Sequence, residues 1–375
     1  MSLQDYQSIS SYSIEKRSKI VLVHKKDSGF TLVELMIALV LGLLISAAAL
    51  QIFYTSSVNS RRQEASSQIQ DNAIFGFSQI QQHLRRTNYG AKSTSAHDEF
   101  FMNHLTPQGG VVLTAPSGVP TVTVPPTPVS WLQGNLSGLV LDKKAISSDL
   151  LSSSASTESS SNLSIGASDQ LTIQYQSGLD GLFDCEGSRI PKDFYVIERY
   201  FVRDEGLACA SAIYEYDEDT VGKASGIDIA TYTVPEVPAV TTTTPPVAAI
   251  PASTKANNLA GTGTIIIPNV DYFRVLLGVS DSTEFATYPE RANIAYMPIP
   301  ASGSLATDQR IVSLQIGILS RSDNPTATQQ SNSDLSFNIL DKTGATLNSD
   351  AIAGPTYLRS VYESTILLRN ARGGL

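Results

Sequence analysis

An unbroken apolar run near the N-terminus is the strongest hydrophobic pattern in the chain. Residues 30–50 read FTLVELMIALVLGLLISAAAL and contain one acid, Glu34, and no base. As a helix rising about 1.5 Å per residue, this run can cross a hydrocarbon core roughly 30 Å thick. The nearest bases after it are Arg61 and Arg62, whereas a basic cluster precedes it, so the positive-inside bias predicts a cytoplasmic N-terminus. The preceding bases are Lys16, Arg17, Lys19, Lys25 and Lys26.

The helical pattern continues beyond the apolar run. From residue 51 to about 87 the sequence turns polar but keeps apolar residues mostly three, four or seven positions apart. Asn88 and Gly90 supply a C-terminal stop. We predict one helix over residues 30–87, roughly 85–90 Å long, with an apolar half at 30–50 and an amphipathic half at 51–88. The periodic apolar residues are Val58, Ala65, Ile69, Ala73, Phe77, Ile80 and Leu84.

Beyond Gly90 the sequence changes to short runs of β-branched and aromatic residues separated by turn residues. The predicted fold class is α+β, with the long N-terminal helix packed on a predominantly antiparallel β-sheet globular domain at residues 89–375. Three stretches poor in core-forming residues interrupt this domain, and we expect them to be solvated loops. They are 106–129, 147–164 and 233–255, the last flexible or polyproline-like around its TTTTPP centre. The predicted strands are 170–176, 194–202, 208–216, 264–267, 272–279, 311–319, 335–340 and 357–368.

Composition and charge narrow the classes of function. The formal net charge is -9 at pH 7, from 26 Lys and Arg against 35 Asp and Glu. A surface with this balance repels phosphates, so direct nucleic acid binding is not expected. Hydrophobic residues make up 42% of 375 positions, which allows a sizeable core and argues against disorder throughout.

The chain has two cysteines, Cys185 and Cys209, far from the apolar run. They permit one disulfide, which an oxidising compartment would favour if the domain is exported. Closing a loop of roughly 25 residues would stabilise the fold by about 3 kcal/mol in the chain-entropy model. Two separate buried thiols are the alternative. A metal site is less favoured, because no further Cys or His set adjoins these positions.

The sequence carries no recognisable catalytic constellation. His83, His97 and His104 cluster around the predicted end of the helix, but no zinc motif surrounds them, and we expect exposed polar residues there. An acidic run at 217–219 followed by Gly222 lacks the alternating ligands of a calcium loop, which favours an acidic turn. No nucleophile elbow, phosphate-binding loop or dinucleotide fingerprint occurs. We therefore expect a structural protein with no cofactor rather than an enzyme.

Glu34 decides between interpretations of the apolar run. A secretory signal would have a shorter apolar stretch, although Ala47, Ala48 and Ala49 could supply a cleavage site. A plain membrane anchor would explain the length but not the acid. An ionised carboxylate at this depth costs about 2.5–3.5 kcal/mol on insertion scales, so Glu34 requires a partner.

The residues around Glu34 resemble a known processing signal. Residues 25–35 read KKDSGFTLVEL, which is similar to the prepilin signal of type IV pilins and type II secretion pseudopilins. The resemblance implies that residues 1–29 form a leader, that a prepilin peptidase cuts between Gly29 and Phe30, and that Phe30 is N-methylated. It further implies that Glu34 neutralises the N-terminal amine of a neighbouring subunit, which is sensible because opposite charges attract strongly at low dielectric.

Segments of the globular domain resemble the PilW family of minor pilins. The matching segments are DCEG at 184–187, YVIERYFV at 195–202, LAC at 207–209, NVDYFRVLLG at 269–278, the strand at 310–321 and YLRSVYESTILLRN at 357–370. Each is weak, but they occur in the family's order from Gly29 almost to the C-terminus. The resemblance implies a cysteine-bracketed strand pair in which Cys185 and Cys209 are bridged.

The family resemblance implies a structural role in pilus assembly. The expected partners are other minor pilins of the PilV, PilX and FimU kind, a PilY-type tip adhesin, the major pilin, the prepilin peptidase and the inner-membrane assembly platform. The expected location is the inner membrane in a single pass, and then the pilus, with a periplasmic or extracellular body. Loss should reduce piliation, twitching motility and, in competent species, DNA uptake.

The sequence leaves two alternatives open. A minor pseudopilin of the J type, from a type II secretion system, shares the whole N-terminal signal. A pilus-tip adhesin or other ligand-binding module would use the loops of the globular domain.

Overall fold

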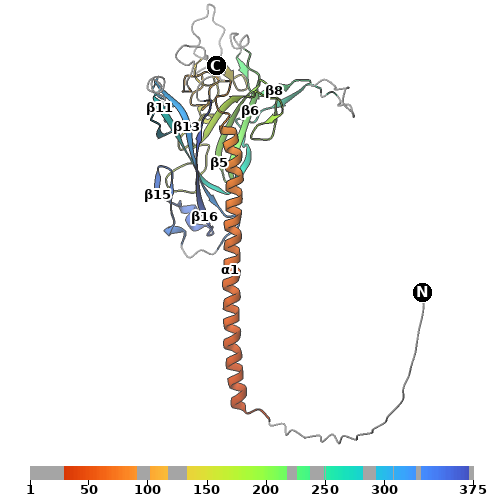
Figure 1. Ribbon diagram of the computed structural model, residues 1–375, viewed down its shortest axis with the longest axis vertical. Coiled ribbons are helices and arrows are strands. Elements are labelled where there is room, and N and C mark those ends of the chain that lie inside the picture. Colours follow the sequence, from red (N-terminus) through yellow and green to blue (C-terminus); the bar gives the residue numbers. More distant parts are fainter. Residues whose placement is uncertain are drawn as a thin grey trace, which may run out of the picture. The chain divides into compact units, whose positions relative to one another are not determined.

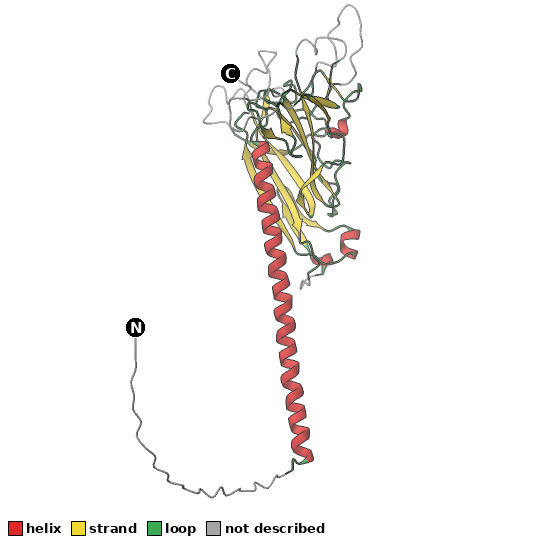
Figure 2. Ribbon diagram, turned by 90° about the vertical axis from the view of Figure 1, so that its right-hand side faces the viewer, coloured by secondary structure: helices red, strands yellow, loops and turns green. Residues whose placement is uncertain are grey.

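The computed structural model describes residues 29–90, 102–116, 133–217, 226–236, 249, 251–281, 293–306, 308–326 and 331–370. The chain forms two compact units, Met1–Ser56 and Ser57–Leu375. Figure 1 labels α1 and several of the strands and colours the chain in sequence order, and Figure 2 distinguishes helices from strands. The leader predicted at residues 1–29 lies outside the described residues except for Gly29.

One long helix, α1, runs from Leu32 to Leu84 and contributes residues to both units. The sequence predicted residues 30–87, so the helix exists but is shorter at each end. Turns follow Leu84, and Asn88 and Gly90 both take positive φ, at 69° and 73°. A backbone in this left-handed region cannot continue a right-handed helix, which explains the stop at this point.

The described strands match all eight predicted ones to within a few residues, as β2, β5, β6, β10, β11, β13, β14 and β16. The others are short or polar and carry little sequence signal. The strands are β1 Leu139–Val140, β2 Leu171–Gln176, β3 Leu182–Phe183, β4 Arg189–Ile190, β5 Tyr195–Arg203, β6 Gly206–Tyr214, β7 Ile227–Asp228, β8 Thr231–Val234, β9 Ser253–Ala256, β10 Thr264–Pro268, β11 Val270–Asp281, β12 Ala295–Pro298, β13 Gln309–Arg321, β14 Ser336–Ile339, β15 Lys342–Thr346 and β16 Arg359–Leu367. The short helices are η2 Ser148–Leu150, η4 Asn332–Asp334 and α4 Ser349–Ala353.

Two four-stranded antiparallel sheets form the body of the second unit. The first sheet has the order β10-β6-β5-β2, and the second has the order β12-β11-β13-β16. Strands β5 and β6 are buried along nearly their whole length, because the first sheet is covered on both faces. This double burial explains why both strands are rich in apolar residues instead of alternating strictly with polar ones.

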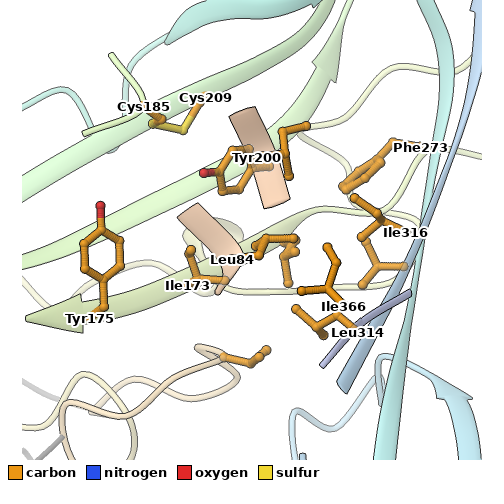
Figure 3. Packing of buried hydrophobic residues seen from close by; sticks show 14 of the residues in the cluster. Leu84, Ile173, Tyr175, Cys185, Tyr200, Cys209, Phe273, Leu314, Ile316 and Ile366 are labelled. Carbon is orange, nitrogen blue, oxygen red and sulfur yellow. A yellow bond between two sulfur atoms is a disulfide. The ribbon is translucent and has the colours of Figure 1, made fainter. Parts of the chain in front are cut away.

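The second half of α1 shares one hydrophobic core with both sheets. Ala73, Phe77, Ile80 and Leu84 of the helix belong to the same buried cluster as residues of β2, β5, β6, β11, β13 and β16. Figure 3 shows Leu84 with Ile173 on one side and Ile366 on the other. The body therefore folds around the amphipathic half of α1, as the sequence predicted.

The expectation of solvated loops is wrong for parts of the low-complexity stretches. Residues 106–116 include Val111 and Val112, which are fully buried, and the N–H of Val112 donates to the carbonyl of Thr172 at 2.8 Å. In the stretch 147–164, Leu150 and Leu163 are buried. These segments cover sheet faces or edges, and the backbone hydrogen bonds that they make hold them there.

The third stretch, 233–255, behaves differently. Its ends contribute to β8 and β9, which pair in antiparallel register from Thr231 opposite Ala256 to Val234 opposite Ser253. The polyproline-like centre that the sequence predicted lies outside the described residues.

Candidate functional site

The N-terminal motif places Glu34 in the first turn of α1. The hydroxyl oxygen of Thr31 accepts a hydrogen bond from the N–H of Glu34 at 3.2 Å, and the carbonyl of Thr31 accepts one from Leu35 at 3.1 Å. Thr31 is thus the N-cap of the helix, a role that our sequence analysis missed. The signal was available, because Thr followed three residues later by Glu is the spacing of a capping box.

The apolar half of α1 exposes its large side chains in this single chain. Phe30 is 81% exposed and Leu41, near the middle of the run, is still 53% exposed. Among the described residues, α1 is the one helix long and apolar enough to cross a membrane. Contiguous apolar surface of this extent needs cover, from lipid or from other protein chains. Glu34 lies within that surface, and Gly29 and Phe30 precede it.

The second half of α1 presents a closely fitted face to the body. Its buried side is made by Ala65, Ile69, Ala73, Gly76, Phe77, Ile80, His83 and Leu84. Gly76 allows the closest approach, because a Cβ at this position would lie 2.6 Å from Cδ1 of Ile267 in β10 and closer still to its Cγ1. A residue without a side chain therefore lets α1 lie directly against β10.

A fully buried carboxylate fixes the end of α1. Glu198, in β5, has no exposed surface, and its Oε1 lies 2.8 Å from Nδ1 of His83 in the last turn of the helix. The same oxygen accepts hydrogen bonds from the hydroxyl of Tyr175 and from the backbone N–H of Cys185, both at 2.9 Å. The other oxygen, Oε2, accepts from the hydroxyl of Tyr200 at 2.7 Å. We call these five residues the Glu198 cluster.

The electrostatics of the Glu198 cluster favour the charged carboxylate. Burial by itself would raise the pKa of Glu198, but the charge and hydrogen bond of His83, together with the two tyrosine hydroxyls, lower it below its ordinary value. Burial, followed by the nearby Glu198 charge, raises the pKa of Tyr175 and Tyr200 well above the ordinary value. Both tyrosines therefore stay protonated and act as donors.

This arrangement corrects the expectation for His83. The sequence predicted an exposed polar residue, whereas the structure buries His83 against Glu198. His104 is also buried, and His97 lies outside the described residues. No group of three His, Cys, Asp or Glu side chains that could hold a metal ion occurs within the described part of the chain. Asp217 is described, but residues 218–225, which contain the rest of the predicted acidic turn, are not.

A disulfide joins Cys185 and Cys209 beside the Glu198 cluster, with a Cα–Cα distance of 6.1 Å. It links the segment before β4 to β6, and Figure 3 shows it close to Tyr200. The hydroxyl of Ser211, also in β6, donates to Asp184 at 2.6 Å and lies 3.0 Å from Glu186. Residues 184–186 are therefore held to β6 by one covalent bond and by carboxylate contacts to a single serine.

The C-terminal strand also contacts the end of α1. The amide of Gln81 donates to the hydroxyl of Ser364 in β16 at 2.8 Å. After the helix, the amide of Asn88 donates to the carbonyl of Asn370 at 2.6 Å. The end of α1 is thus bound on one side by the first sheet and on the other by the last strand of the second.

Two buried ion clusters, which sequence reasoning missed, organise the second sheet. Asp271 pairs with Arg359 at 2.6 Å and with Arg321 at 3.1 Å, and Arg321 and Arg359 are direct cross-strand neighbours in β13 and β16. Arg274 pairs with Asp169 at 3.1 Å and with Asp341 at 2.6 Å. The available signal was the pair of charges within the apolar segment NVDYFRVLLG at 269–278.

Comparisons with known proteins bear on this arrangement. A family model described as type IV pilus-assembly protein W matches residues 237–370, and the model of the prokaryotic N-terminal methylation motif matches residues 24–50. The first match includes β9 to β16 and therefore the whole second sheet. The cysteine-bracketed pair β5 and β6 lies outside it, so the resemblance of those strands to the family stays a prediction.

Structural similarity is weaker. The type IV-like pilin TTHA1219 from Thermus thermophilus matches with 11% sequence identity and a TM-score of 0.22 over 54% of this chain and 80% of that chain. No curated protein matches the sequence. The two family models establish that the chain combines a PilW-type region with a prepilin-type N-terminal motif.

Proposed function

We propose that this pilin of the PilW type is a low-abundance structural subunit of the complex that primes type IV pilus assembly and lies at its tip. One observation carries the proposal. The same helix bears a methylation motif and an exposed apolar half at one end, and at the other end an amphipathic half buried in a folded body. A membrane tether alone does not require the second half to be the centre of the hydrophobic core.

Processing is the first step of the proposed role. A prepilin peptidase cuts between Gly29 and Phe30 and methylates the new amine of Phe30. Thr31 then caps the first turn of α1, so the short N-terminal segment before the helix is only two residues long. The new positive amine and the carboxylate of Glu34 are therefore held close to the start of the helix.

Assembly then depends on Glu34. Placing the ionised carboxylate of Glu34 in lipid costs free energy. The positively charged N-terminal amine of an adjoining subunit lowers this cost by pairing with it. During assembly the exposed apolar side chains of residues 30–50 leave their contacts with lipid and pack against the equivalent helices of other subunits. The driving force is close packing, because lipid tails and these side chains are similarly apolar.

The proposed partners are those that the resemblance to the PilW family implies. They are the minor pilins of the PilV, PilX and FimU kind, a PilY-type tip adhesin, the major pilin and the inner-membrane assembly platform. Before assembly the chain sits in the inner membrane in a single pass with its N-terminus in the cytoplasm. After assembly the body lies on the cell surface.

Mass spectrometry of the N-terminus from sheared fibres tests processing and incorporation together. We expect a methylated phenylalanine corresponding to Phe30. A Glu34→Ala variant should be cut normally but be depleted from sheared fibres at least tenfold. Equal recovery of the Glu34→Ala and unaltered proteins would contradict the electrostatic part of the proposal.

A deletion strain tests the role of the assembled subunit. We expect fewer surface pili and reduced twitching motility, both restored by the unaltered gene. Normal piliation together with a defect in protein secretion would instead assign the chain to a type II secretion system. The match to a pilus-assembly family over residues 237–370 favours the pilus.

A further inference from the structure

The Glu198 cluster connects the disulfide-bonded segment with the end of α1, two parts of the molecule that the proposed function does not relate to each other. The backbone N–H of Cys185 and the ring of His83 reach the same oxygen of Glu198, at 2.9 and 2.8 Å. Cys185 is one half of the disulfide, and His83 is in the last turn of α1. The position of the disulfide-bonded segment and the docking of the helix therefore share one buried carboxylate.

Without the disulfide, hydrogen bonds would remain to hold residues 184–186. Beside the contacts of the Ser211 hydroxyl, the N–H of Ser211 and the amide of Asn258 donate to Glu186 at 2.9 and 2.7 Å. Asp184 and Glu186 both approach the hydroxyl of Ser211, and Glu198 lies close enough to add its charge. Burial, opposed mainly by the Ser211 hydrogen bond, raises the pKa of Asp184, and the charges of Glu198 and Glu186 raise it further. Three carboxylates thus gather around this segment, where like charges at close range repel, and the disulfide is the covalent bond that keeps the segment beside β6.

We infer that the Cys185–Cys209 disulfide is an oxidation-dependent latch for the end of α1, which it operates by placing the Cys185 N–H on Glu198. With the bond formed, Glu198 has all four donors and holds His83. Without it, the repulsion among the three carboxylates displaces segment 184–186 against its remaining hydrogen bonds, and Glu198 loses the Cys185 N–H as a donor. The buried carboxylate is then incompletely paired, which favours its solvation and releases His83 with the last turns of the helix.

The chemistry of closing the latch is a thiol–disulfide exchange. The two thiols of Cys185 and Cys209 lose two protons and two electrons to an oxidised dithiol protein, and a new S–S bond forms while the donor's S–S bond breaks. An oxidant of this class belongs outside the cytoplasm. The consequence for assembly, that only the oxidised body presents a fixed helix, rests on the proposed function, whereas the latch itself does not.

Hydrogen exchange on the full chain in detergent micelles tests the latch without reference to fibres. Amides of residues 77–84 report on helix docking, and amides of β11 report on the body as a whole. We expect the Cys185→Ser/Cys209→Ser variant to exchange at least tenfold faster over residues 77–84 while β11 keeps its protection. Glu198→Gln, with the disulfide intact, should produce the same local change, because the latch acts through this side chain.

Glu205→Gln is the matched control. Glu205 pairs with Arg203 at 2.8 Å at the β5–β6 turn but is largely exposed, so its loss should leave residues 77–84 unchanged. Unchanged protection of residues 77–84 in the double cysteine variant would overturn the inference. Loss of protection over β11 and residues 77–84 together, in both variants, would also overturn it, since the disulfide would then stabilise the body globally. Neither result bears on processing at Gly29 or on the role of Glu34.

Discussion

Gly76 of α1 and Ile267 of β10 approach so closely that no side chain fits between them. A Cβ at Gly76 would lie 2.6 Å from Cδ1 and 3.2 Å from Cβ of Ile267, which is itself fully buried and cannot move aside freely. Glycine is otherwise a poor residue for a helix interior. Its presence here follows from the contact between helix and sheet.

Replacing Gly76 by leucine should therefore destabilise the body by about 1–3 kcal/mol, because the extra atoms force α1 away from β10. Denaturant unfolding of the full chain in mild detergent measures the change. Adding Ile267→Ala should recover part of it by making room. The control is Gly42→Leu, since no atom lies within 4 Å of the position a Cβ would take there. Equal destabilisation by both leucines would mean that the close contact is unimportant.

Replacing His83 by alanine should cost about 3–5 kcal/mol of unfolding free energy, because it leaves the buried Glu198 without its charged partner. The double variant His83→Ala/Glu198→Gln should lose much less than the sum of the two single changes, since the residues interact directly. Equilibrium unfolding of the unaltered protein, the two single variants and the double variant gives the double-mutant cycle. Additive changes would show that the 2.8 Å contact contributes nothing.

Lowering the pH should reduce the unfolding free energy of the body, partly through protonation of Glu198. Its pKa is lowered in the folded state, so its stabilising contribution is present above the unfolded-state pKa of about 4.3 and is lost as the pH falls through the lower folded value. Asp169 and Asp184, whose pKa values burial raises, act in the opposite direction. The stability difference between unaltered protein and Glu198→Gln isolates the first contribution. That difference should shrink as the pH falls below the unfolded-state pKa, and a constant difference would exclude this mechanism.

Removing the charge of Asp271 should be far more costly than removing that of Asp180. Asp271 is buried and bound by Arg359, whose side chain is 2% exposed, so Asp271→Asn should cost about 3–5 kcal/mol. Asp180 pairs with Arg189 at 2.7 Å, but both side chains are well exposed, so Asp180→Asn should cost at most about 1 kcal/mol. Thermal or denaturant unfolding compares the two. Similar small effects would show that the Asp271 cluster is not needed for the second sheet.

Elements that depend on local pattern were predictable from the sequence alone. The spacing of apolar residues along the chain predicts the apolar run, the amphipathic continuation of α1 and the strongly apolar strands. The methylation motif is likewise a contiguous string, and two cysteines allow only one bond within the chain. The capping role of Thr31 is equally local, because a Thr three positions before a Glu is the spacing of a capping box.

The polar contacts between distant segments became visible only in the folded chain. Glu198 stands in an apolar strand and His83 in a polar turn of helix, and no spacing along the chain indicates that they meet. The same is true of Asp271 with Arg359, and of the buried parts of 106–116 and 147–164, whose composition resembles that of solvated loops. Burial of a polar group depends on the partners that folding brings to it, and those partners lie far away in sequence.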